Sequence, residues 1–162
     1  MPRPSAAPVI HVGVVSDTHG LMRPEALAAL AGASRILHAG DVGAPAILEA
    51  LAAIAPVIAV RGNNDRGPWA RALPTRTVVE LEGRRILMLH DLKELDGDPA
   101  EDGIAAVIAG HSHRPSAEER GGVLFLNPGS AGPRRFRLPI TVARLQIAGG
   151  RLAAQIIPLL EA

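Results

Sequence analysis

The sequence predicts an α/β fold in which two β-sheets pack together and helices lie outside them. In roughly the first 60 residues, short apolar segments of strand type alternate with Ala- and Leu-rich segments that begin with proline, as helices often do. Such alternation predicts a parallel sheet. After about residue 75, β-rich segments are joined by Glu82-Gly83 and by Gly149-Gly150, which are hairpin signals. The change of rhythm therefore predicts a mixed sheet arrangement.

The predicted strands share one feature, which is that most of them run directly into a polar loop. The first begins at Ile10 and ends in Ser16-Asp17-Thr18-His19-Gly20. The other strands are expected at 34–39, 56–60, 76–81, 84–89, 105–109, 123–126, 140–147 and 151–157, and the helices at 24–30 and 45–54. The acidic stretch 92–102 leaves room for one or two helical turns.

Composition limits the function. The 162 residues are expected to form one domain with its own core, after a loose Pro-rich lead at residues 1–8. A net charge of +1 and only 2% aromatic residues argue against nucleic acid or an anionic membrane as a partner. The sequence contains no cysteine, which excludes disulfides and thiolate metal sites within it. Because no apolar leader or membrane-spanning stretch is apparent, we expect a cytoplasmic protein.

Seven polar side chains follow the ends of predicted strands, and all of them offer an oxygen or an imidazole nitrogen. They are Asp17, His19, Asp41, Asn63, His90, His111 and His113. Donors of this kind suit Mn, Fe, Co, Ni or Zn, whereas calcium prefers oxygen alone. Seven ligands exceed one tetrahedral site and fit two ions that share a carboxylate. Two such ions, about 3.5–4 Å apart, would hold a bridging hydroxide for attack on phosphorus.

Some of these residues have a second interpretation. Asn63 lies in Gly-Asn-Asn-Asp, which is ordinary turn chemistry. His38 lies inside a strand, and we interpret it as a buried structural histidine or one that supports the ligands. The pair His90-Asp91 also occurs in the HD phosphohydrolases, but those are helical proteins and here the pair ends a predicted strand.

Five short motifs occur in order along the chain: Asp17-x-His19, Gly40-Asp41, Gly62-Asn63-x-Asp65, the strand-ending His90, and Gly110-His111-x-His113. This order resembles the calcineurin-like metallophosphoesterase superfamily, from about residue 9 onward. The short length, with Asn127-Pro128-Gly129-Ser130 near the end, is similar to its small, capless phosphodiesterase branch. The resemblance implies a four-layer α/β/β/α sandwich of two mixed sheets flanked by helices.

The resemblance also implies a role for each ligand. Asp17, His19 and His113 would hold the first of two divalent metal ions, Asn63, His90 and His111 would hold the second, and Asp41 would bridge them. The implied reaction is hydrolysis of a small phosphodiester by a metal-bridging hydroxide, with Mn²⁺ the expected ion and Fe, Ni, Co or Zn as alternatives. Two other readings stay open: a phosphomonoesterase, and a non-catalytic interaction module similar to the retromer subunit of this fold. Balanced charge and few aromatic residues argue against a nuclease.

Two positions depart from the common family pattern. Many members carry histidine where this chain has Asn64, and an amide can hydrogen-bond phosphate but cannot supply a proton near neutral pH. Asp41 and Asn64 are the candidate catalytic residues, and we expect weak turnover of substrates with poor alkoxide leaving groups. The second departure is Asp91, which stands at a usual glycine and would either orient His90 or repel an anionic substrate.

Three arginines are candidate phosphate clamps by charge and placement: Arg61, Arg66 and Arg134. Arg134 follows Pro133 in a pair that resembles the family's own. The cluster at 134–137 is too small to predict nucleic-acid binding. The expected partner is a small phosphorylated substrate, and the oligomeric state stays open, with a homo-oligomer as one option.

Overall fold

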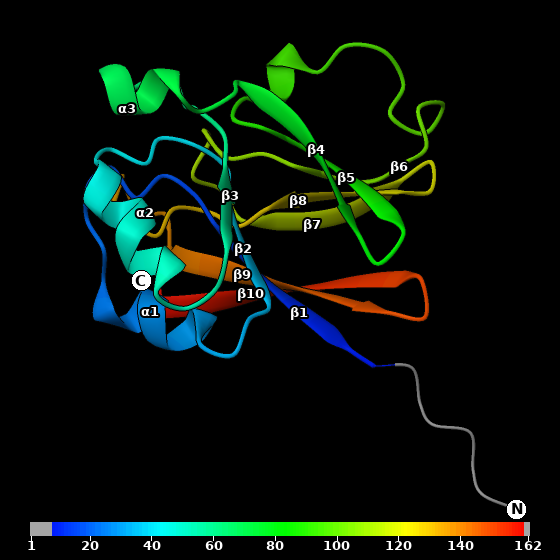
Figure 1. The fold of residues 1–162 in the computed structure, drawn as a ribbon, viewed down its shortest axis with the longest axis horizontal. Helices are drawn as coiled ribbons and strands as arrows, with labels where there is room; N and C mark the ends of the chain where they lie inside the picture. The colour runs from blue at the N-terminus through cyan, green and yellow to red at the C-terminus, as the bar shows by residue number, and fades with distance from the viewer. Residues whose placement is uncertain (1–7, 161–162) are drawn as a thin grey trace, which may run out of the picture.

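Two five-stranded sheets form the framework of residues 8–160, the part of the chain that this computed structural model describes (Figure 1). Apart from Pro8, the lead expected at residues 1–8 lies outside the described residues. The first sheet has the order β10-β9-β1-β2-β3 and the second the order β4-β5-β6-β8-β7. The first sheet comprises β1 (Ile10–Val15), β2 (Arg35–His38), β3 (Val57–Ala59), β9 (Ile140–Ala148) and β10 (Arg151–Leu160). The second comprises β4 (Arg76–Leu81), β5 (Arg84–Leu89), β6 (Ile104–Ile108), β7 (Ser116–Arg120) and β8 (Val123–Asn127).

Both sheets are mixed, as the sequence predicts. Strands β1, β2 and β3 are parallel, and the hairpin β9–β10 pairs antiparallel to β1. In the second sheet β5, β6 and β8 are parallel, while the edge strands β4 and β7 run antiparallel to them. The carboxyl ends of three parallel strands in each sheet therefore lie at one edge of that sheet, where open α/β sheets place their ligands.

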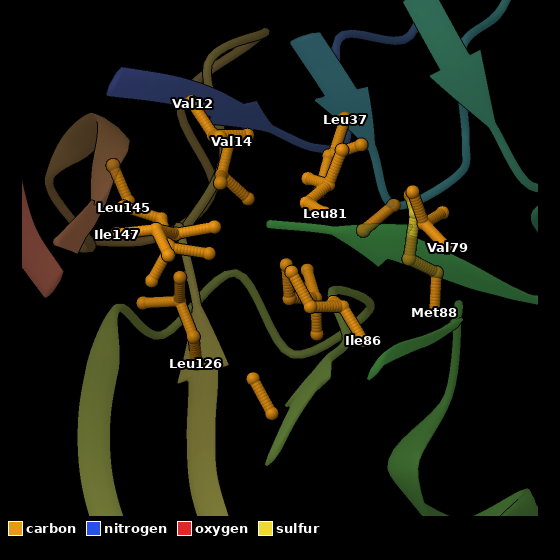
Figure 2. Close-up of a cluster of buried hydrophobic side chains, with 14 of the residues drawn as sticks. Val12, Val14, Leu37, Val79, Leu81, Ile86, Met88, Leu126, Leu145 and Ile147 are labelled. Carbon is orange, nitrogen blue, oxygen red and sulfur yellow. The ribbon is translucent and has the colours of Figure 1, made fainter. Parts of the chain in front are cut away.

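The core lies between the two sheets (Figure 2). Val12 and Val14 of β1 and Leu145 of β9 face Ile86 and Met88 of β5 across this layer, and all five side chains are fully buried. Because the aliphatic side chains from both sheets interlock without any aromatic ring, the sheets are held at a fixed spacing by close-packed branched residues.

Helices cover the outer face of the first sheet. They are α1 (Pro24–Leu30), α2 (Pro45–Ala52) and α3 (Pro68–Arg71), and each begins with proline. Leu30 and Leu51 pack against Ile36 in a second apolar cluster. Gly13 permits this packing, because a Cβ there would lie 2.6 Å from the Leu30 side chain.

The outer face of the second sheet is covered differently. Among the described residues, the segment between β5 and β6 contains a single 3₁₀ turn, η1 (Leu92–Glu94), so the expected outer helical layer is thin on this side. Two elements were not predicted, namely α3 and β7. None of the helices within residues 8–160 is long and apolar enough to cross a membrane.

Candidate metal centre

The seven strand-end residues come from the carboxyl ends of five parallel strands. Asp17 and His19 follow β1, Asp41 follows β2 and Asn63 follows β3, while His90 follows β5 and the pair His111 and His113 follows β6. The first sheet supplies four of the residues and the second supplies three, so the site lies where the ends of the two sheets meet.

Local backbone conformation directs most of these side chains. Five of the seven have a positive φ, which costs a non-glycine residue about 1–2 kcal/mol. They are Asp17 (56°), His19 (47°), Asp41 (55°), His111 (73°) and His113 (62°). Such strain gathers at functional sites. Strand geometry does not continue through Asp17 and His19, since β1 ends at Val15 and left-handed conformations bring the two side chains together.

One oxygen of the Asp17 carboxylate is held by the protein itself. Its Oδ2 accepts hydrogen bonds from the Ser16 hydroxyl at 2.6 Å and from the His111 N–H at 3.1 Å. Gly110 makes this approach possible, because a Cβ at that position would overlap Ser16 Oγ and lie 2.6 Å from Asp17 Oδ2. The bonds leave Oδ1 free to face the other side chains.

The imidazoles converge on the two carboxylates. Asp17 Oδ1 lies 3.3 Å from His113 Nε2 and 3.7 Å from both His19 Nε2 and His90 Nε2. His90 Nε2 is also 3.2 Å from Asp41 Oδ2. Two sets of ligand atoms lie within 4.8 Å of one another and could each hold a metal ion: Asp17, His19 and His113, and Asp17, Asp41 and His90.

Unpartnered atoms show that the cluster fits a cation. Among the described residues, Asp17 Oδ1, His19 Nε2 and His90 Nε2 are buried and have no hydrogen-bond partner. The other ring nitrogen of His90 donates to the Ala39 carbonyl at 2.7 Å, a contact that leaves the Nε2 lone pair directed at the carboxylates. Metal-ligating histidines are typically oriented by such a bond.

The charges of the cluster are mutually stabilised in the metal-free protein. Burial alone would raise the pKa values of Asp17 and Asp41, but the neighbouring histidines outweigh it, so both pKa values are lowered. The carboxylate of Asp17 raises the pKa of His19, against the effect of burial. Burial would lower the pKa of His90, but the two carboxylates raise it. Two ionised carboxylates at pH 7 favour cation binding.

Asp65 is a buried carboxylate whose part the motif alone did not reveal. It accepts backbone N–H bonds from Val42 at 3.2 Å, from Gly43 at 2.9 Å and from Gly62 at 2.9 Å. These bonds tie the loop after β2, which carries Asp41, to the loop after β3. Asp65 is therefore a positioning residue for Asp41, whose Oδ2 lies 3.7 Å from His19 Nε2 and 3.2 Å from His90 Nε2.

His38 is buried and lies behind the cluster, as the sequence predicts. Its Nδ1 accepts a hydrogen bond from the Gly40 N–H at 3.1 Å, so the proton is on Nε2, 3.0 Å from the Thr18 hydroxyl. That hydroxyl donates in turn to the Val42 carbonyl at 2.8 Å. The chain of bonds fixes the backbone between Asp17 and His19.

Asn63 and His111 lie on the open side of the cluster. Both line a cavity of about 310 Å³, and the exposed fraction of the His111 side chain is 44%. The cavity is lined by Arg61, Gly62, Asn63, Asp65, Thr75, His90, Asp91, Glu94 and His111. Of the three candidate arginines, Arg61 therefore faces the site.

Arg134 lines a second hollow, beside a different pair of the histidines. His19, His113, Pro133 and Arg135 complete the lining of this hollow. Arg135 was not predicted as a site residue, and its charge opposes protonation of His19. Arg66 is exposed and lines neither hollow.

The two departures from the family pattern have defined contacts. The Asn64 amide donates to Asp41 Oδ2 at 3.0 Å, and its backbone N–H donates to Oδ1 at 2.8 Å. The Ala39 carbonyl orients His90, and Asp91 contacts other groups. One of its oxygens lies 3.8 Å from His111 Nε2 and the other accepts from the Lys93 N–H at 3.0 Å, capping η1.

The two packed β-sheets and the polar cluster at their carboxyl ends together define a metal-binding phosphoesterase with an α/β sandwich fold. The chain belongs to the calcineurin-like phosphoesterase superfamily, whose domain matches residues 10–150. It is 37% identical over 158 residues to a probable metallophosphoesterase of Methanothermobacter thermautotrophicus, covering 90% of this chain and 91% of that one. It is 33% identical over 146 residues to phosphodiesterase YfcE of Escherichia coli (strain K12), covering 71% and 76%. The fold also matches vacuolar protein sorting 29 of Cryptosporidium parvum, with a TM-score of 0.74, 18% identity, and 94% and 99% coverage.

Proposed function

We propose that the protein hydrolyses a small phosphodiester with two divalent cations, Mn²⁺ first among them. The observation that carries the proposal is the convergence of three buried, unpartnered ligand atoms, on Asp17, His19 and His90, at one point. Asp17, His19 and His113 would hold one ion, Asn63, His90 and His111 the other, and Asp41 would contact both. Relatives named metallophosphoesterase and phosphodiesterase support the same reading.

In this reaction a water oxygen bonds to phosphorus and one P–O ester bond breaks. The attacking water releases a proton, which a basic leaving alkoxide takes up, whereas p-nitrophenolate departs as the anion. Cations held by these residues would supply activation of the water and would neutralise charge on the phosphate. The protein supplies orientation. Asn64 donates two bonds to Asp41 and keeps its carboxylate between the two halves. Arg61 and Arg134 would bind phosphate oxygens, and each lines a hollow that also contains predicted metal ligands.

The test is release of p-nitrophenolate from bis-p-nitrophenyl phosphate by metal-stripped protein reloaded with Mn²⁺. Asp41→Ala should lower kcat/KM by about 1,000-fold, because each factor of ten corresponds to ~1.4 kcal/mol and loss of a shared ligand removes several kcal/mol of charge stabilisation. Asp96→Ala is the matched control, since Asp96 is exposed and pairs with Arg76 on the surface. It should leave kcat/KM unchanged.

A folded protein that binds two ions and hydrolyses neither this diester nor p-nitrophenyl phosphate would contradict the proposal. The non-catalytic reading would then take its place. Hydrolysis of the monoester with no turnover of the diester would instead retain the metal centre and change the substrate class.

A further inference from the structure

The outer face of the second sheet is apolar near the candidate metal centre. Val107 of β6 pairs in register with Phe125 of β8, which pairs with Glu118 of β7, so the three side chains form a row across this face. Leu87 and Leu89 of β5 belong to the same apolar cluster. Phe125 is only partly buried, and Arg120 lies over its ring at 5.1 Å.

A cavity opens over this row because the covering segment is short. Between β5 and β6 the described chain forms only η1, and Leu92 in this turn remains 37% exposed. The cavity, of about 520 Å³, has a lining that includes Asp91, Leu92, Val107, His111, Ser116 and Phe125. We call it the apolar groove. Its volume is within the ~300–1,000 Å³ typical of small-molecule sites.

The apolar groove runs into the candidate metal centre. Asp91 and His111 line both the groove and the cavity beside His90 and Asn63. The wall between them is preorganised, because the Asn127 side-chain amide donates to the Gly110 carbonyl and to the Ser112 hydroxyl, both at 3.1 Å. A molecule whose phosphate lies among the ligands can therefore extend a neighbouring group into the apolar groove.

Resting on the proposed phosphodiesterase function, we propose that the apolar groove binds an apolar substituent of the size of an aromatic ring on the phosphodiester. The continuity of the groove with the metal centre identifies substrate, and not a protein partner, as the occupant. Lys93 and Arg114 on its exposed rim also suit an anionic ester. Burial of about 80 Å² of ring at ~25 cal/mol per Å² corresponds to about 30-fold in kcat/KM.

The test compares two diesters with the same leaving group, benzyl p-nitrophenyl phosphate and methyl p-nitrophenyl phosphate. The Mn²⁺-loaded protein should favour the benzyl ester by about 30-fold. Ser116→Trp, which fills the groove from the exposed edge strand β7, should bring the ratio close to 1 by lowering kcat/KM for the benzyl ester. Val78→Trp is the matched control, because it adds the same ring to an exposed site on the other edge strand, outside the groove.

Calorimetric binding of benzylphosphonate and methylphosphonate to the same proteins separates the groove from the chemistry. If benzylphosphonate binds more tightly than methylphosphonate and Ser116→Trp abolishes the difference, the apolar groove is supported. This holds even if neither diester is hydrolysed, and in that case only the proposed phosphodiesterase function is contradicted. Hydrolysis of both esters at equal kcat/KM, with equal phosphonate affinities in wild type and Ser116→Trp, would overturn the groove and leave the phosphodiesterase standing. If Ser116→Trp changes the oligomeric mass but not the ratio of kcat/KM for the two esters, the face is a protein contact and the substrate groove is overturned.

Discussion

The two halves of the candidate metal centre differ in how fully the protein encloses them. The half formed by Asp17, His19 and His113 is mostly buried, and the His113 side chain is only 3% exposed. In the half formed by Asn63, His90 and His111, two of the three residues are exposed and face a cavity. The enclosed half is thus set by the protein's own hydrogen bonds, while the open half is left for substrate to complete. This difference can be tested one residue at a time.

The largest effect is expected at His38, which supports the enclosed half. Burial lowers its pKa from 6.5 to about 4. Between these values the unfolded chain binds a proton that the folded protein does not, so the free energy of unfolding should fall as the pH falls from 6.5 to 4, by up to about 3 kcal/mol. Urea unfolding of the metal-free protein across this range measures the effect.

His38→Asn is the control for this pH dependence, because its amide oxygen can accept the Gly40 N–H and does not titrate. In the same pH window, the slope of its unfolding free energy against pH should be smaller than that of the wild type by the contribution of about one proton. Identical pH slopes in the two proteins would show that His38 is protonated in the folded state and would contradict the assigned hydrogen bonds.

Asn64 is expected to have the next largest effect, on the open half. A histidine at this position could donate a proton to a leaving alkoxide, a contribution of about 100-fold at the lower end of general acid catalysis. Asn64→His should therefore raise the turnover of an alkyl diester such as dimethyl phosphate by about 100-fold. Turnover of bis-p-nitrophenyl phosphate should change little, because its leaving group needs no proton.

Equal gains for alkyl and aryl diesters in Asn64→His would count against the acid-catalysis argument. A fall in both would mean that the two bonds from Asn64 to Asp41 matter more than the missing proton donor. The ratio of the two rates identifies a gain that is specific to the alkyl diester without any assumption about the amount of active protein. The absolute rates distinguish equal gains from a fall in both.

Histidine removal compares the two halves directly. His113→Ala should lower the stability of the metal-free protein by about 2 kcal/mol, because the buried Asp17 carboxylate loses the imidazole nitrogen 3.3 Å away that helps to hold its pKa low. His111→Ala removes a side chain that is 44% exposed and should stay within about 0.5 kcal/mol of the wild type. Both variants should bind one Mn²⁺ ion in place of two. Equal losses of stability would contradict the difference in enclosure.

The sequence motifs predicted groups that lie at this edge, because each group stands in the loop that follows a strand. His90 directly follows the last residue of β5, and His111 lies in the loop after β6, which pairs with β5. The left-handed conformations of Asp17 and Asp41 could not be predicted in this way, because they depend on backbone bonds to distant segments. The N–H of Asp17, for example, donates to the Gly40 carbonyl. The same is true of Asp65, whose partners at Val42 and Gly43 come from another loop.

The missed strand β7 illustrates another limit. Its residues, Ser116–Arg120, are all exposed and show no alternation of apolar and polar side chains. The strand forms because its backbone pairs with β8, whose Val123 and Leu126 anchor the pair in the core. Pairing at a sheet edge of this kind is a tertiary effect that the local sequence does not encode. The thin cover over the second sheet likewise became visible only in three dimensions.

The smallest effect is expected at Asp91, which adds a negative charge to the open half. Because its carboxylate lies 3.8 Å from His111 Nε2, Asp91→Asn should weaken the binding of the more weakly held Mn²⁺ ion by about 10-fold, the lower end for residues that support metal ligands. Asparagine keeps the oxygen that caps η1, so the fold should be retained. Glu94→Gln removes the same charge from the wall of the same cavity and should change the affinity less than 2-fold, about what an exposed charge contributes. Calorimetric titration of the three proteins with Mn²⁺ measures the dissociation constants of both ions. Equal weakening of Mn²⁺ binding in the two variants would show that the open half responds to overall charge and not to the carboxylate beside His111.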